Sequence, residues 1–139
     1  MFGSILALGA SLALSLLGPD SGMAPVPTDL HPIEARVVER TNSQRARYGL
    51  PPLSVDPQLV SSARRHAAWM TNRRSLVHTS QPVGENIAMG QSSSAEVINS
   101  WMNSSGHRAN ILNPGYTRIG VACYVTTGGT IYWCQQFLR

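Results

Sequence analysis

Apolar positions recur at helical spacing early in the chain. Ile33, Val37 and Val38 begin one such stripe, which continues to Tyr48. Residues three and four positions apart share one face of an α-helix, so this pattern predicts an amphipathic helix. Gly49 follows directly, and glycine commonly ends helices. We therefore expect the first helix to end at Tyr48.

A second helix is predicted from Asp56-Pro57 to about Arg73. Aspartate caps a helix N-terminus, and proline fits the first helical turn. The apolar stripe of this segment consists of Leu59, Ala63, Ala67 and Met70. His66 lies on the same face. Because its neighbours there are core-type residues, we expect His66 to be a core or supporting histidine rather than a ligand.

Further helical signals follow an irregular segment. Residues 76–88 contain proline and glycine and lack helical spacing, so we expect irregular structure with at most a short strand. Residues 93–96 read Ser-Ser-Ala-Glu, a capping box that predicts a third helix over about 94–103. After a Ser-Ser-Gly break, residues 107–112 are expected to form one more helical turn.

The C-terminal part of the chain, residues 118–139, changes to the period of two that is typical of strands. Gly128-Gly129 divides it into a β-hairpin. A two-residue turn at this position would place Cys123 directly opposite Cys134, within reach of a disulfide. A bulge or longer loop would change this geometry, and two buried thiols are the alternative. Helices followed by a hairpin favour an α+β fold, or a sheet between helical layers.

Composition narrows the classes of function. The 139 residues and 15.0 kDa suit one domain. All eleven basic residues are arginine, which excludes a Schiff-base lysine or a P-loop lysine. Two cysteines cannot form a four-thiolate zinc site. The pairs Arg64-Arg65 and Arg73-Arg74 are typical of a solvated helix face and carry no series of aromatic residues, so we expect no nucleic-acid binding. The net charge of +4 favours weak contact with an anionic envelope surface.

The N-terminal region is typical of a targeting segment. Residues 4–17 are almost all Leu, Ala, Ile, Gly and Ser, which fits the apolar part of a secretory signal. The run is shorter than the ~18–20 residues that span a bilayer. We expect a signal peptide or N-terminal hydrophobic segment at 1–24, a linker at 25–32 and one domain at 33–139. The protein is therefore predicted to be secreted, either extracellular or periplasmic, in the cell envelope.

Three polar residues lie in irregular, glycine-adjacent sequence, where functional sites often occur. They are His78, Glu85 and His107. Two imidazoles and one carboxylate suit a divalent cation, zinc above all, with water in the open position. The alternative is a buried polar network that ties a loop to a sheet. Spacing alone leaves both interpretations open.

Four segments carry a family resemblance. They are residues 41–50 (TNSQRARYGL), 77–80 (VHTS), 84–88 (GENIA) and 101–112 (WMNSSGHRANIL). In this order they resemble the CAP superfamily of SCP, PR-1 and cysteine-rich secretory protein domains, and above all its exported bacterial branch. The resemblance implies a three-layer α-β-α sandwich with a central antiparallel sheet.

The same resemblance implies a cleft with two histidines and two glutamates, suited to zinc or another divalent ion. His78, Glu85 and His107 match three of these four positions. The second glutamate of eukaryotic members lies three residues after the tryptophan of the third helix. Here that position, three after Trp101, is Ser104. Only three polar side chains remain for a cation, which leaves room for water.

Three functions follow from this resemblance. The first is an exported binding module whose cleft holds a divalent cation and a lipid or sterol, a peptide or a glycan. The second is a metal-assisted hydrolase in which Glu85 acts as general base. The third is a structural secreted domain with a vestigial cleft. The missing second glutamate favours the first and third, and whether the protein is an enzyme is left open.

Overall fold

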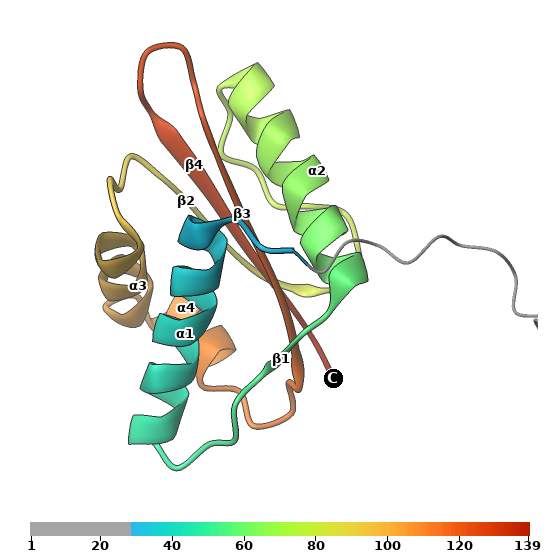
Figure 1. Cartoon of the computed structure of the whole chain (residues 1–139), viewed down its shortest axis with the longest axis vertical. Coiled ribbons are helices and arrows are strands. Elements are labelled where there is room, and N and C mark those ends of the chain that lie inside the picture. The colour runs from blue at the N-terminus through green and yellow to red at the C-terminus, as the bar shows by residue number, and fades with distance from the viewer. Residues whose placement is uncertain (1–28) are drawn as a thin grey trace, which may run out of the picture.

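The computed structural model describes residues 29–139, which form four helices and four strands (Figure 1). The helices are α1 (Pro32–Arg47), α2 (Pro57–Arg73), α3 (Ser94–Met102) and α4 (Ser105–Ile111). The strands are β1 (Ser54–Val55), β2 (Gly84–Met89), β3 (Arg118–Val125) and β4 (Ile131–Leu138). The expected signal segment, residues 1–24, lies outside the described residues, as does the first half of the expected linker.

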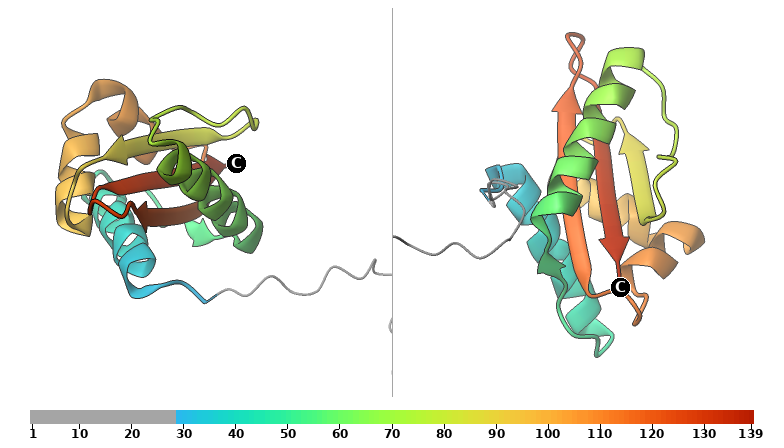
Figure 2. Two further views of the ribbon diagram at one scale, coloured as in Figure 1. Left: turned by 90° about the horizontal axis from the view of Figure 1, so that it is seen from above. Right: turned by 90° about the vertical axis from the view of Figure 1, so that its right-hand side faces the viewer.

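These elements form three layers. The sheet has the strand order β1-β3-β4-β2, with α2 on one face and α1, α3 and α4 on the other (Figure 2). The predicted α+β sandwich is therefore confirmed. The sheet is antiparallel except at β1, a two-residue strand that runs parallel to β3. Within residues 29–139, no helix is both long and apolar enough to cross a membrane.

The helix boundaries follow the capping signals. The side chain of Asp56 accepts hydrogen bonds from the backbone amides of Gln58 (2.8 Å) and Leu59 (3.3 Å) at the start of α2. Ser93 accepts from the amide of Glu96 (3.1 Å) at the start of α3. Because these side chains satisfy otherwise unpaired first-turn amides, both predicted helix starts are confirmed.

The hairpin register is one residue away from the prediction. Val125 pairs with Ile131, and the loop between β3 and β4 closes around residues 127–129 instead of a two-residue turn. Gly129 adopts a φ of 88°, which glycine tolerates without strain. A shift of one residue sends a side chain to the other face of the sheet.

The predicted disulfide is consequently wrong. Cys123 pairs with Trp133, and Cys134 pairs with Ala122, so the two sulfurs lie on opposite faces. Cys123 packs against the core under α1, whereas Cys134 belongs to the core under α2. Both cysteines are free thiols.

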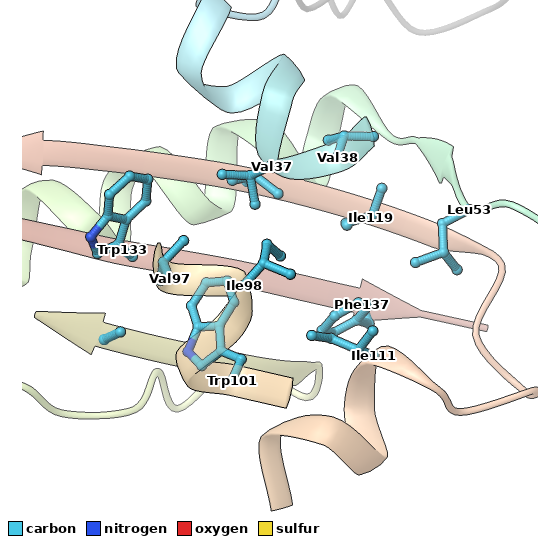
Figure 3. Close-up of a cluster of buried hydrophobic side chains, with 12 residues drawn as sticks. Val37, Val38, Leu53, Val97, Ile98, Trp101, Ile111, Ile119, Trp133 and Phe137 are labelled. Carbon is cyan, nitrogen blue, oxygen red and sulfur yellow. The ribbon is translucent and has the colours of Figure 1, made fainter. Parts of the chain in front are cut away.

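Two apolar cores hold the layers together. The core between the sheet and α1, α3 and α4 is drawn in Figure 3. It contains Val37, Val38, Leu53, Ala88, Val97, Ile98, Trp101, Ile111, Ile119, Val121, Trp133 and Phe137. The core under α2 includes three alanines, and α2 lies so close to the sheet that a Cβ at Gly120 would overlap the backbone of Leu59.

Arg45 joins α1 to the segment after α4. Its side chain is fully buried, and its guanidinium donates only to backbone carbonyls. The acceptors are Pro51 (2.9 Å), Ile111 (2.9 Å), Asn113 (2.9 Å) and Tyr116 (3.3 Å). Burial lowers the pKa of Arg45. This arginine fixes the C-terminal end of α4, and with it the helix that carries His107.

The outer edge of β2 is covered by side chains. Trp101 donates its indole N–H to the carbonyl of Ile87 (3.2 Å), and Asn110 donates to the carbonyl of Glu85 (3.1 Å). These bonds use carbonyls that point away from β4, and they reduce the tendency of an edge strand to pair with another chain. They also hold α3 and α4 beside β2, which brings His107 to the edge where Glu85 lies.

Candidate functional site

Glu85 is at the centre of the candidate site. Its side chain is only 4% exposed. One carboxylate oxygen, Oε1, accepts from Nδ1 of His78 (2.8 Å) and from the backbone amide of Thr79 (2.8 Å). The other, Oε2, accepts from the amide of Gln136 (2.9 Å) and the thiol of Cys134 (3.5 Å). Proton abstraction by Glu85 would first require one of these bonds to break.

The thiol of Cys134 is held in its protonated form. Burial raises its pKa well above the ordinary value of 9.0, and the charge of Glu85 raises it further. A neutral thiol can donate its proton, so Cys134 supports the carboxylate instead of competing with it. Gln136 also supports the carboxylate, because its Nε2 donates to Glu85. Its buried Oε1 has no hydrogen-bond partner among the described residues.

His78 is oriented by this carboxylate. Its side chain is 61% exposed, in the segment that leads into β2. An ionised carboxylate only accepts hydrogen bonds, so Nδ1 of His78 carries the hydrogen in the bond to Glu85. In the neutral imidazole this leaves the lone pair on Nε2, which is the nitrogen available to a cation or a ligand.

His107 lies half-buried in the first turn of α4. Burial lowers its pKa below the ordinary value of 6.5, and the nearby charge of His78 lowers it further. Its Nδ1 is 2.9 Å from the hydroxyl of Ser104. Its backbone carbonyl accepts from the side chain of Asn86 (3.1 Å). Burial thus favours the neutral form of His107 at neutral pH, and the charge of His78 acts in the same direction.

A buried polar network begins at Asn86, which contacts the backbone of His107. The amide of Asn86 donates to Gln135 (3.1 Å) and accepts from Asn110 (2.9 Å). Gln135 in turn donates to the hydroxyl of Thr41 on α1 (2.7 Å). The network crosses from β2 through β4 to α1, so it fixes the positions of three elements around the site.

Sequence reasoning missed the glutamines of this network. Gln135 and Gln136 follow Trp133 and Cys134 in a strand that is otherwise apolar. Both side chains are fully buried. Two adjacent polar residues in a strand covered on both faces were the signal that could have identified them, because buried amides require partners.

Of the three predicted residues, the structure joins His78 to Glu85 by a hydrogen bond, whereas His107 contacts Ser104. Within residues 29–139, no three His, Cys, Asp or Glu side chains lie close enough to hold a single ion. Glu85 has both oxygens in use, so it contacts His78 instead of a common ligand. The imidazoles of His78 and His107 remain as the candidate ligands of this site.

Ser104 lies where the resemblance led us to look for a second glutamate. It is the N-cap residue of α4, and its hydroxyl contacts Nδ1 of His107 at 2.9 Å. A serine hydroxyl can orient this imidazole, although it adds no negative charge. Within the described part of the chain, no carboxylate bonds to His107, so Ser104 lacks the orienting acid of a serine nucleophile.

Of the two roles expected for His66, the core position is wrong, whereas the supporting role agrees with its contacts. His66 is half-exposed instead of buried in the core under α2. Its Nε2 lies 2.6 Å from the carbonyl of Val77, and its ring stacks on Trp69 with centroids 5.8 Å apart. His66 lies at the border of the buried stripe of α2, where its ring contacts the segment that follows the helix.

Comparison with known proteins identifies the family. Residues 38–137 match the family model described as the cysteine-rich secretory protein family, or CAP. The chain belongs to this family. The CAP match covers α1 to β4, the part of the chain that forms the sandwich and contains both histidines.

Relatives extend from bacteria to plants. This CAP domain is 40% identical over 129 residues to YkwD, an uncharacterised protein of Bacillus subtilis. That alignment covers 81% of this chain and 49% of YkwD, so the chain spans about half the length of this relative. Pathogenesis-related protein 1 of Arabidopsis thaliana is 28% identical over 142 residues, covering 90% of this chain and 88% of the plant protein.

A solved structure confirms the fold. An extracellular protein containing an SCP domain, from Bacillus anthracis, superimposes with a TM-score of 0.69 at 28% identity. The match covers 81% of this chain and 45% of that one. The resemblance inferred from the four sequence segments is thus confirmed at the level of family and fold, and this relative is extracellular.

Proposed function

We propose that this CAP domain is an exported binding module, and that His78 and His107 bind a divalent cation in its cleft. The observation that carries the proposal is the 2.8 Å hydrogen bond from Nδ1 of His78 to the buried carboxylate of Glu85. Histidine ligands of metal ions commonly donate their second N–H to a carboxylate, which fixes the tautomer and makes the other nitrogen a better ligand.

His107 supplies the second nitrogen. Its lowered pKa keeps it neutral, as a ligand must be. The contact between its Nδ1 and Ser104 leaves Nε2 as the nitrogen for the cation. Glu85 serves as the orienting carboxylate for His78, a role different from the direct ligand expected from the sequence.

A bound zinc ion would supply a Lewis-acidic centre that attracts a carbonyl, carboxylate or phosphate oxygen. Only two protein side chains hold the ion, so the remaining positions are open to water or to a ligand. This arrangement supports binding of an oxygen-bearing group of a lipid, peptide or glycan. It supports proteolysis less well, because the hydrogen-bonded oxygens of Glu85 are not free to activate water.

Zinc titration of the full chain by calorimetry tests this proposal. We expect one zinc ion per chain, with binding lost in His78→Ala and in His107→Ala. His31→Gln is the matched control, because His31 is exposed at the start of α1 and should leave zinc binding unchanged. Glu85→Gln should weaken zinc about 10- to 100-fold, since it removes the orienting carboxylate.

The opposite result is equally informative. Absence of binding at submillimolar zinc, with both alanine variants merely less stable, would show that the two histidines belong to a structural network. Thermal unfolding of each variant separates these cases, because a folded variant that no longer binds zinc has lost a ligand.

A further inference from the structure

Large apolar side chains are exposed along α2 and the segment that follows it. Trp69 is 39% exposed, Leu76 44% and Val77 46%. Trp101 and Trp133, in contrast, are buried in the core. Exposed apolar residues gathered in one region mark interaction surfaces more often than isolated ones do.

The same region is basic. Arg65, Arg73 and Arg74 are exposed, and residues 57–84 contain four arginines but no Asp or Glu. Arg64 forms an ion pair with a glutamate of α1. Among residues 29–139, the other three arginines of this stretch have no carboxylate within ion-pair distance.

Several of these side chains contact one another or line the same hollow, and Arg74 and Leu76 are their neighbours in sequence. The guanidinium carbon of Arg73 lies 5.1 Å from the ring centroid of Trp69. Arg65, Trp69 and Val77 line a common hollow of about 490 Å³. The contact of His66 with the carbonyl of Val77 holds the 75–83 segment against α2. We call this surface the α2 face, and it consists of Arg65, Trp69, Arg73, Arg74, Leu76 and Val77.

We propose that the α2 face binds the surface of a lipid bilayer rich in anionic lipid. Tryptophan and aliphatic side chains favour the boundary between headgroups and acyl chains, where a ring is half in an apolar environment. Arginines beside them attract anionic headgroups. The α2 face supplies both groups on one helix and the adjacent segment, and α2 forms the outer layer of the sandwich (Figure 1).

A bilayer fits this surface better than a nucleic acid does. The ring of Trp69 is already flanked by Arg73 and by a stacked His66, so no free ring face is left for a base. Its edge and the Leu76-Val77 pair can still enter an interface. The α2 face consists of residues other than the proposed zinc ligands and goes beyond the cation site, and His78 lines the same hollow at its border.

Tryptophan fluorescence of the full chain provides a site-specific test. Vesicles of phosphatidylglycerol and phosphatidylcholine in equal parts are compared with vesicles of phosphatidylcholine alone. Because Trp69 is the half-exposed tryptophan, binding should shift the emission to shorter wavelength, and brominated lipids should quench it. We expect binding to the anionic vesicles alone. Trp69→Phe should abolish the shift and keep the protein folded.

Two double variants distinguish binding by the α2 face from a general attraction due to the positive net charge of the protein. Arg65→Gln/Arg73→Gln removes two charges from the α2 face, and Arg36→Gln/Arg47→Gln removes two exposed charges from α1 on the opposite layer. We expect affinity for anionic vesicles to fall about 20- to 30-fold in the first variant, at about 1 kcal/mol for each arginine near the membrane. The second variant should change it less than about fourfold.

Several outcomes would overturn the proposal. These are an equal loss in both double variants, equal binding to neutral vesicles, no binding at all, or binding without quenching of Trp69. The apolar residues 4–17 are present in every variant, so they cannot explain a difference between variants. Binding should also persist in EDTA and in His107→Ala, which separates a failure of this proposal from a failure of the cation site.

Discussion

At the scale of the residue, the environment decides what each polar group does. Glu85 and Glu39 are the same amino acid, but one is buried with partners on both oxygens and the other is exposed on α1. Cys134 donates its proton because burial and a nearby charge keep it neutral. His107 stays uncharged for related reasons, and this has a measurable consequence for stability.

The stability of the protein should decrease as the pH falls through about 6.5. The pKa of His107 is below 6.5 in the folded protein, whereas the unfolded chain titrates near that ordinary value. Between the two pKa values the unfolded chain binds more protons, so the free energy of unfolding falls with falling pH and levels off below the folded pKa. His107→Gln should remove this part of the pH dependence.

Urea unfolding at several pH values between about 5 and 7.5 measures this effect. An identical pH dependence in the wild type and in His107→Gln would show that His107 titrates alike in both states.

At the scale of the element, the length of the hairpin loop decides on which face of the sheet each cysteine lies. The loop around 127–129 gives β3 and β4 a register in which Cys123 and Cys134 face different layers. Burial raises the pKa of the Cys123 thiol to about 11, so this thiol is weakly reactive in the folded state.

We expect the protein to contain two thiols even when it is purified without reductant. Alkylation after unfolding, followed by mass spectrometry, should add two alkyl groups to each chain. An intramolecular disulfide would leave none, and would mean that the hairpin has the two-residue turn instead. Alkylation of the folded protein should be slow, because Cys134 is buried and Cys123 is half-buried.

The contact between α2 and the sheet depends on Gly120. A Cβ at this position would overlap the backbone of Leu59, which cannot rotate away as a side chain can. Gly120→Ala should therefore lower the free energy of unfolding by about 1–3 kcal/mol or more. Gly106 in α4 has open space around its Cβ position, so Gly106→Ala should instead stabilise the protein by up to about 1 kcal/mol. Chemical denaturation of both variants distinguishes the two effects.

At the scale of the whole molecule, an ion pair connects the two helical layers. Glu34 on α1 is 2% exposed, and it accepts from Arg64 on α2 at 2.6 Å and 3.0 Å. The two helices lie on opposite faces of the sheet (Figure 2). The hydrogen bond to Glu34 raises the pKa of Arg64. This bidentate pair therefore joins the two helical layers directly.

A double-mutant cycle on Glu34→Gln and Arg64→Met should give a coupling energy of about 1.5–3 kcal/mol, typical of charge-assisted hydrogen bonds with a buried partner. The neighbouring Arg65 offers a control, because it is exposed and unpaired within the described residues. A cycle with Arg65→Met should give a coupling close to zero. A near-zero value for Arg64 as well would mean that solvent screens the pair.

The sequence by itself determined the helices, their starts and the family. Caps such as Asp56 and Ser93 act on the next few residues, so their effect does not depend on the rest of the fold. The four family segments also indicated His78, Glu85 and His107 as the candidate site. These features are local, or they are recorded in short motifs.

Tertiary structure decided how these residues meet. The strand β2, the hairpin register, the exposure of His66 and the partners of Glu85 all depend on contacts between segments distant in the chain. Gln136 approaches Glu85 only because β4 lies beside β2, and no local pattern specifies that pairing. A one-residue change of register reverses the face of every side chain in a strand, so small differences in a loop decide which cysteines and carboxylates are neighbours.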